Sequence, residues 1–170
     1  MALIKIGSNG LDTGVGGKVL QVVSTTKTDT FTTTSGSFTD ITGFTLSITP
    51  SSTSSKILIL MNANLSNAGT TFVTQVRLVR DSTAISVGAS AGSRTSSTSH
   101  VRLGAVYEVG SFSATTLDAP ASTSTLTYKV QMLIQTGGAS SGVLNRTGND
   151  SDDSYNGRTA SNITAMEIAG

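Results

Sequence analysis

Residues 126–134 read Leu-Thr-Tyr-Lys-Val-Gln-Met-Leu-Ile, and this stretch decides the fold class. Apolar side chains stand at every second position from Leu126 to Ile134, and polar side chains fill the positions between them up to Gln131. Only Leu133 departs from the alternation. A period of two is the pattern of a β-strand with one buried face. The sequence therefore predicts a strand here, packed against a core.

Other stretches repeat this pattern between turn signals such as Pro50-Ser51-Ser52. The stretch 56–65 starts fully apolar and ends alternating, which predicts a central strand covered on both faces at one end. No window shows a sustained helical period with caps. About nine short strands are typical of an antiparallel sandwich or barrel, and a jelly roll fits the length best. We expect strands at 19–24, 38–49, 56–65, 71–80, 84–87, 101–109, 126–134, 143–144 and 162–168.

Composition agrees with a β-rich protein that binds or assembles. The chain has 170 residues, of which 26 are Ser and 28 are Thr, whereas charged residues make up only 12%. Thr and other β-branched side chains favour pleated, half-buried strands. A low net charge with a mean hydropathy near zero is unlike a disordered chain. We therefore expect an all-β, antiparallel β-sandwich of jelly-roll type, formed as a single domain by residues 18–170.

The first 17 residues differ from this domain. Leu3, Ile4 and Ile6 form a short apolar stretch, and a glycine-rich loop follows at 14–17. Chain termini fray unless something ties them down, so a frayed terminus is one interpretation. The other is an N-terminal arm or edge strand, residues 1–17, whose three apolar side chains contact a neighbouring chain. We expect the arm.

Charge and cysteine content exclude several function classes. The formal net charge is +1 and the arginines are scattered, so we expect no nucleic-acid surface. The absence of Cys removes disulfides, thiolate nucleophiles and Cys-based zinc sites. The start of the chain does not read as a secretory signal, and the longest apolar run, 57–61, is too short to span a bilayer. We expect no membrane contact and no cofactor.

Two candidates for catalysis or metal binding lack the context they need. Gly88-Ala89-Ser90-Ala91-Gly92 matches a nucleophile pattern that requires a strand turning sharply into a helix, and no helix signal follows Ser90. We interpret this stretch as a flexible loop. His100 is the only histidine and cannot build a zinc site alone. We expect a surface or interface residue; burial at a threefold axis would instead make it a pH sensor or metal ligand.

The acidic segment 149–157 offers a weak cation motif. Asp152, Ser154, Asn156 and Gly157 have the opening spacing of a calcium loop, but Ile163 stands where the bidentate Glu belongs. We expect a solvated turn rather than an ion site. The glycines at 14–17 lack the remaining positions of a phosphate-binding loop.

Five segments carry a family resemblance. The most distinctive is Ile163-Thr164-Ala165-Met166-Glu167-Ile168, and the others are 38–58, 127–131, 145–150 and 155–158. Together they resemble a group of small β-rich structural proteins of tailed bacteriophages, especially marine and cyanobacterial ones, over about residues 18–170. The resemblance implies a virion component assembled in the bacterial cytoplasm, a jelly-roll homotrimer attached to the capsid or tail. It brings no catalytic residues.

The first functional hypothesis is a non-enzymatic capsid decoration (cement) protein. In this hypothesis Leu3, Ile4 and Ile6 of the arm clamp the phage major capsid protein. A fibre protein needs a shaft of heptads or short β repeats, and the sequence contains none.

The second hypothesis is a tail-fibre, collar or receptor-binding component, attached to tail proteins. Its loops would contact host surface glycans through Arg94, Asp152, Tyr155 and Asn156. A glycan-hydrolysing virion enzyme is the third hypothesis, although no acid–base pair stands out around Glu108 or Glu167.

Overall fold

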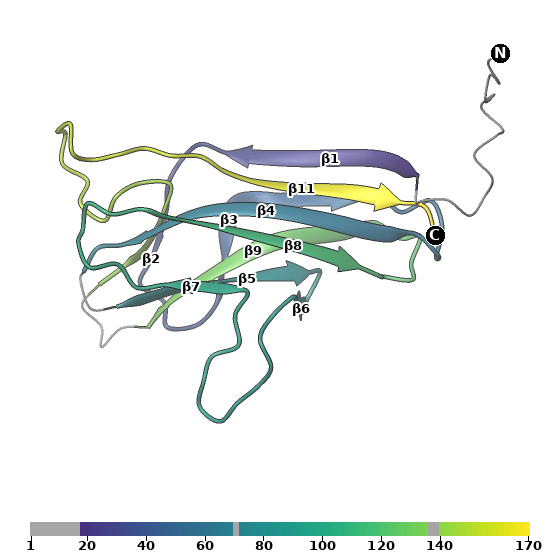
Figure 1. The fold of residues 1–170 in the computed structure, drawn as a ribbon, viewed down its shortest axis with the longest axis horizontal. Helices are drawn as coiled ribbons and strands as arrows, with labels where there is room; N and C mark the ends of the chain where they lie inside the picture. Colours follow the sequence, from purple (N-terminus) through teal and green to yellow (C-terminus); the bar gives the residue numbers. More distant parts are fainter. Residues whose placement is uncertain (1–17, 70–71, 136–139) are drawn as a thin grey trace, which may run out of the picture.

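The computed structural model describes residues 18–69, 72–135 and 140–170, which form eleven strands in two antiparallel sheets lying face to face (Figure 1). Sheet A contains β1 (Val19–Lys27), β2 (Phe31–Thr33), β4 (Lys56–Asn67), β8 (Gly110–Asp118), β10 (Gly142–Leu144) and β11 (Ser161–Ile168). Sheet B contains β3 (Thr39–Ile48), β5 (Val73–Arg80), β6 (Thr83–Ile85), β7 (Ser99–Val101) and β9 (Leu126–Gln135). These ranges contain no helix that could cross a membrane.

Short strands lying end to end combine into eight rows. In sheet A, β1 and β2 pair with β11 and β10, which share one edge of β4, while β8 pairs with the other edge. In sheet B, β9 lies between β3 and β5, and β6 and β7 share the far edge of β5. The rows are numbered here in the order in which the chain forms them, and β1 with β2, β6 with β7, and β10 with β11 each count as one row. In these numbers the order of the rows is 1-8-3-6 in sheet A and 2-7-4-5 in sheet B. Two interlocked Greek keys of this kind make a jelly roll, so the predicted all-β sandwich of jelly-roll type is confirmed.

The core lies between the sheets and follows the alternation of the sequence. The five apolar residues that share a face in the stretch 126–134 are all at most 5% exposed. The first four, from Leu126 to Met132, pack with inward side chains of β3 and β4, namely Phe44, Leu46, Ile57, Ile59 and Met61. Glycine is required at one point of this framework: β3 has a register shift between Asp40 and Thr45, and Gly43 in this irregular stretch has a φ of 75°.

The prediction of a strand at 101–109 is wrong. β7 ends at Val101, a loop covers 102–109, and the next strand is β8. Inward positions of β8 include the polar Thr116 and Asp118, whereas the apolar Leu117 points outward and is 55% exposed. The alternation of apolar and polar residues is therefore weak in β8. The preceding loop does alternate, although its residues belong to no strand. The sequence does not predict β2 either, because Phe31 is its only apolar side chain.

Asp118 can face inward because two side chains of sheet B meet it. Arg80 Nη1 lies 2.6 Å from each carboxylate oxygen, and the hydroxyl of Tyr128 donates to Oδ2 at 2.6 Å. Burial and the neighbouring carboxylate raise the pKa of Tyr128, so its hydroxyl remains a donor. The trio joins the two sheets and supplies the partners that a largely buried carboxylate needs.

Candidate functional site on the outer face of sheet A

An apolar row crosses the outer face of sheet A. The register places Val22 of β1 opposite Met166 of β11, Met166 opposite Leu58 of β4, and Leu58 opposite Leu117 of β8. We call these four residues the apolar row. Their neighbours along each strand point into the core, so the row faces outward. Opposed Cβ atoms on one face lie about 4.5–5.5 Å apart, which makes the row a continuous apolar surface.

Solvent reaches much of this surface. On the two outer strands Val22 and Leu117 are each 55% exposed, and the two central residues of the row are half-buried. Val19 and Leu20, 49% and 44% exposed, extend the apolar surface toward the start of β1. Nothing in the described part of the chain covers it. Contiguous exposed apolar patches mark interaction surfaces in soluble proteins.

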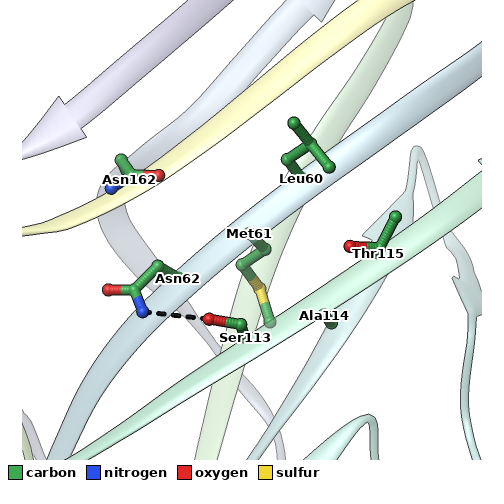
Figure 2. Close-up of a pocket in the computed structure, with 7 residues that line it drawn as sticks. All are labelled: Leu60, Met61, Asn62, Ser113, Ala114, Thr115 and Asn162. Carbon is green, nitrogen blue, oxygen red and sulfur yellow. Dashed lines mark hydrogen bonds between the residues drawn. The ribbon is translucent and has the colours of Figure 1, made fainter.

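Neutral polar groups border the apolar row on the same face. Asn62 Nδ2 donates to Ser113 Oγ at 3.2 Å, as Figure 2 shows, and to Ser111 Oγ at 3.0 Å. These amide and hydroxyl groups can bind a partner without the desolvation cost of charges. An open depression of about 240 Å³ lies among them, lined by Leu60, Met61, Asn62, Ser113, Ala114, Thr115 and Asn162.

A buried carboxylate positions the edge strand that starts the row. Glu167 of β11 is 1% exposed and accepts hydrogen bonds from Gln21 Nε2 at 2.6 Å and from the Ser51 amide and hydroxyl at 2.7 and 2.6 Å. Burial raises the pKa of Glu167, but the hydrogen bonds outweigh this effect and hold it at about 2. The charged side chain therefore ties β1 and the turn after β3 to β11.

The predicted arm residues Leu3, Ile4 and Ile6 lie outside the described residues. The described chain starts at Lys18, whose carbonyl accepts a hydrogen bond from the Ala169 amide at 2.9 Å. The arm therefore joins the domain beside the exposed, apolar start of β1.

The predicted loop residues do not form one site. Arg94 lies in the loop between β6 and β7, which hangs below the sandwich in Figure 1, and donates to Ala91 O of the same loop at 3.4 Å. Asp152, Tyr155 and Asn156 lie in the loop between β10 and β11, at the left-hand end of the same view. The structure thus gathers these three residues and separates them from Arg94.

A tyrosine that sequence reasoning did not select joins this second loop. Tyr107 and Tyr155 are 53% and 80% exposed, and their ring centroids lie 6.5 Å apart at an interplanar angle of 61°. In the strand that the sequence predicts at 101–109, Tyr107 shares a face with apolar residues such as Val101 and Leu103. Because that segment is a loop, its ring points to solvent instead.

The remaining candidates lie at the surface. Ser90 is exposed in a loop that no helix follows, and His100 is exposed on β7. In the acidic segment, Asn156 Oδ1 accepts from the Thr147 hydroxyl and Asp153 Oδ1 from the Tyr155 amide, so these oxygens brace the loop. Within 18–69, 72–135 and 140–170, no three His, Asp or Glu side chains gather in a group that could hold a metal ion.

One stretch of the sequence, the run 57–61, does indicate the apolar row, although the four residues of the row are far apart along the chain. The run 57–61 is apolar at every position and predicts a strand covered on both faces. Sheet B covers only the inner face, on which Ile57, Ile59 and Met61 lie. Leu58 and Leu60 lie on the outer face, where they are half-buried and no described element packs over them.

The row order defines an all-β jelly-roll protein, and the outer face of its sheet A carries an exposed apolar row. Neither the known family models nor the curated protein sequences match the chain. A solved structure titled "Structure of infectious bursal disease virus Gx strain" is similar, with a TM-score of 0.44 and 12% identity. The similarity covers 88% of this chain and 42% of that chain, so the present chain spans less than half of the viral chain's length. The jelly-roll assignment rests on the row order and not on this likeness.

Proposed function

We propose that the chain is a non-enzymatic structural component of a bacteriophage virion, a capsid decoration (cement) protein that binds and stabilises the outer shell as an oligomer. The observation that carries the proposal is the exposed apolar row on sheet A. The partner is the major capsid protein, through an apolar, charge-poor part of its outer surface. The resemblance to small structural proteins of tailed phages supports the same function and implies a homotrimer.

The shape of the face favours a broad protein surface over a small ligand. The row runs across four paired strands, and the depression beside it is open rather than enclosed. Such a face gains free energy by burying area against another surface, at about 25 cal/mol per Å² of apolar area. Neutral amides and hydroxyls around it add hydrogen bonds without the cost of burying charges.

The N-terminal residues extend the proposed contact. Seventeen residues precede Lys18 and reach at most about 55–60 Å when fully extended. Because they leave the domain beside Val19, their apolar side chains Leu3, Ile4 and Ile6 are within reach of the coat subunit that the apolar row would contact. We propose that they bind the shell alongside the row.

The test places one charge on the outer face of each sheet. Leu117→Lys introduces an ammonium into the apolar row, and Ser47→Lys, at an exposed outward position of β3 in sheet B, is the control. We expect Leu117→Lys to bind shells stripped of the protein at least about tenfold more weakly, since burying an unpaired charge is costly, and Ser47→Lys to bind within about twofold of the parent. Cosedimentation measures both; equal binding of the two variants contradicts the proposal.

A second variant in the same assay tests the arm. Removal of residues 2–10 deletes Leu3, Ile4 and Ile6, and we expect it to abolish shell binding while leaving a folded oligomer. Circular dichroism and sedimentation velocity report the fold and the assembly state. Normal binding by the truncated protein refutes the role of the arm and leaves that of the apolar row to the charged variants.

The alternative is a tail-fibre, collar or receptor-binding component that contacts host surface glycans. The observation that favours it is the exposed pair Tyr107 and Tyr155 at one end of the sandwich. Loop variants that lose host adsorption with normal shell stability would support this alternative.

A further inference from the structure

The loop that carries Tyr155 connects β10 to β11, and the side chain of the buried Asn145 holds the base of this loop. β10 and β11 pair with the same edge of β4, and residues 145–160 form the excursion between them. Asn145 is fully buried; its Nδ2 donates to Lys27 O at 2.8 Å and Asp29 O at 3.0 Å, and its Oδ1 accepts from the Ser161 hydroxyl at 2.6 Å. Its φ of 64° is one that Asn tolerates. The sandwich therefore fixes the base of the loop.

Internal bonds fix the rest of the loop. The Asp150 carboxylate lies 2.6 Å from Arg158 Nη2 and 3.4 Å from Arg146 Nε. These ion pairs connect the segment that leaves β10 with the segment that returns to β11. The Thr147 hydroxyl bonds to Asn149 O and Asn156 Oδ1. A loop braced in this way loses little conformational entropy when it binds.

The two tyrosines meet because this loop is hydrogen-bonded to the loop 102–109. The Asn149 amide donates to Val106 O at 3.0 Å, and Asn149 Nδ2 lies 3.5 Å from the Tyr107 hydroxyl. The result is an edge-to-face pair of rings displayed to solvent on two joined loops. Exposed, rigid aromatic rings are features that recur at binding sites.

From this arrangement we propose a binding site for a neutral saccharide, in which a sugar ring stacks on Tyr155 with Tyr107 beside it. The C–H faces of a sugar pack on aromatic rings, while its hydroxyls need polar partners, and Ser151, Asp152 and Ser154 are exposed around the pair. The inference deepens the glycan-contact alternative and is independent of shell binding.

Charge selects neutral over acidic sugars. The two loops carry four carboxylates and three guanidinium groups, so the region is net negative by one charge: Glu108, Asp150, Asp152 and Asp153 against Arg102, Arg146 and Arg158. An anionic saccharide would be repelled there.

Titration of the full-length protein with cellohexaose, maltohexaose and chitotetraose tests the site. Tyrosine fluorescence is a direct probe, because the chain has no Trp and, of its three tyrosines, Tyr128 is buried. We expect at least one of the three to bind with a Kd on the order of 1 mM. Tyr155→Ala should weaken that binding at least about tenfold, and Tyr155→Phe, which keeps the ring, should remain within about threefold.

The controls separate this site from the apolar row. Leu117→Lys should bind the saccharide normally, and Tyr155→Ala should bind shells normally. Absence of binding by all three saccharides at about 10 mM, a Tyr155→Ala variant that binds as the parent does, or tighter binding of a hyaluronan hexamer would overturn the proposal. None of these results bears on shell binding, which the shell assay measures separately.

Discussion

The outer faces of the two sheets have the same strand geometry and opposite chemistry. On sheet B, Asp40, Gln131 and Arg77 stand opposite one another in register. Gln131 donates to Asp40 at 2.6 Å and accepts from Arg77 Nε at 2.7 Å, and Lys129 Nζ donates to Asp40 at 2.8 Å. On sheet A the corresponding row is Val22, Met166, Leu58 and Leu117.

The difference favours sheet A as the face that binds a partner. The polar groups of the sheet B row satisfy one another, and the Arg77 guanidinium also lies 4.2 Å above the Phe38 ring. The apolar row of sheet A has no such internal compensation among the described residues, since its exposed carbon can be removed from water only by another surface. We therefore propose that sheet A carries the assembly surface, and we expect sheet B to face solvent.

The strongest way to break this comparison is to make sheet A as polar as sheet B. The triple variant Val22→Thr, Leu58→Thr and Leu117→Thr places a β-branched, strand-favouring side chain at each position while removing apolar contact area. We expect shell binding to weaken about a hundredfold, or about 2.7 kcal/mol. The free energy of unfolding should change by less than about 1 kcal/mol, because these positions face outward. Cosedimentation and urea unfolding measure the two effects.

The matched control makes sheet B more apolar. Thr45→Val, Ser47→Val and Thr127→Val alter outward positions of β3 and β9. Shell binding should stay within about twofold of the parent. A comparable loss in both triples would mean that the two faces are equivalent and that the comparison has no functional content.

The carboxylate beneath the apolar row gives the next largest effect. Glu167→Gln should lower the free energy of unfolding at pH 7 by about 2 kcal/mol, since donors that now meet a carboxylate would face an amide. Because the folded pKa is depressed to about 2 from an ordinary value of 4.5, the carboxylate stabilises the fold above pH 4.5 and loses this effect as the pH falls toward 2.

Denaturant unfolding between pH 2 and 7 checks this prediction. Glu167→Gln should show a shallower acid loss than the parent, with the residual slope coming from other carboxylates such as Asp40. Parallel pH profiles for the two proteins would contradict the assigned role of Glu167.

The smallest effect is expected on sheet B. A hydrogen bond from Lys129, and a second from Gln131, lower the pKa of Asp40, but the Asp40 side chain is 52% exposed. Lys129→Met should therefore change the free energy of unfolding by about 0.5 kcal/mol or less, and the difference should shrink in 1 M salt. A loss above about 2 kcal/mol would mean that sheet B depends on its charges more than the account allows.

The sequence was sufficient for the fold class because the alternation of apolar and polar residues is strong in a strand that pairs with another strand on each edge. β9 is an example: its inward side chains form the centre of sheet B, and their period of two is visible without any structure. It failed at β8, an edge strand, because Asp118 gains its partners Arg80 and Tyr128 from the opposite sheet. A pattern in one strand cannot contain those distant contacts.

The candidate sites were predicted unevenly for the same reason. Tyr155 and Asp152 stand in a segment that composition marks as a loop, whereas Tyr107 alternates as a strand residue does. The apolar row arises from the register of four strands that are far apart in the sequence, so no local window displays it. Its only local trace is the apolar run 57–61.

The proposed role in the shell is tested most directly by the copy number of the protein in purified virions of the phage that, by our proposal, encodes it. Quantitative mass spectrometry would give the ratio to the major capsid protein. A protein spread over the shell would be present at one copy per coat subunit or a simple fraction of that number, and this is the result that we expect. Absence from the particle would contradict it, and so would about a dozen copies, which a tail or collar component would give.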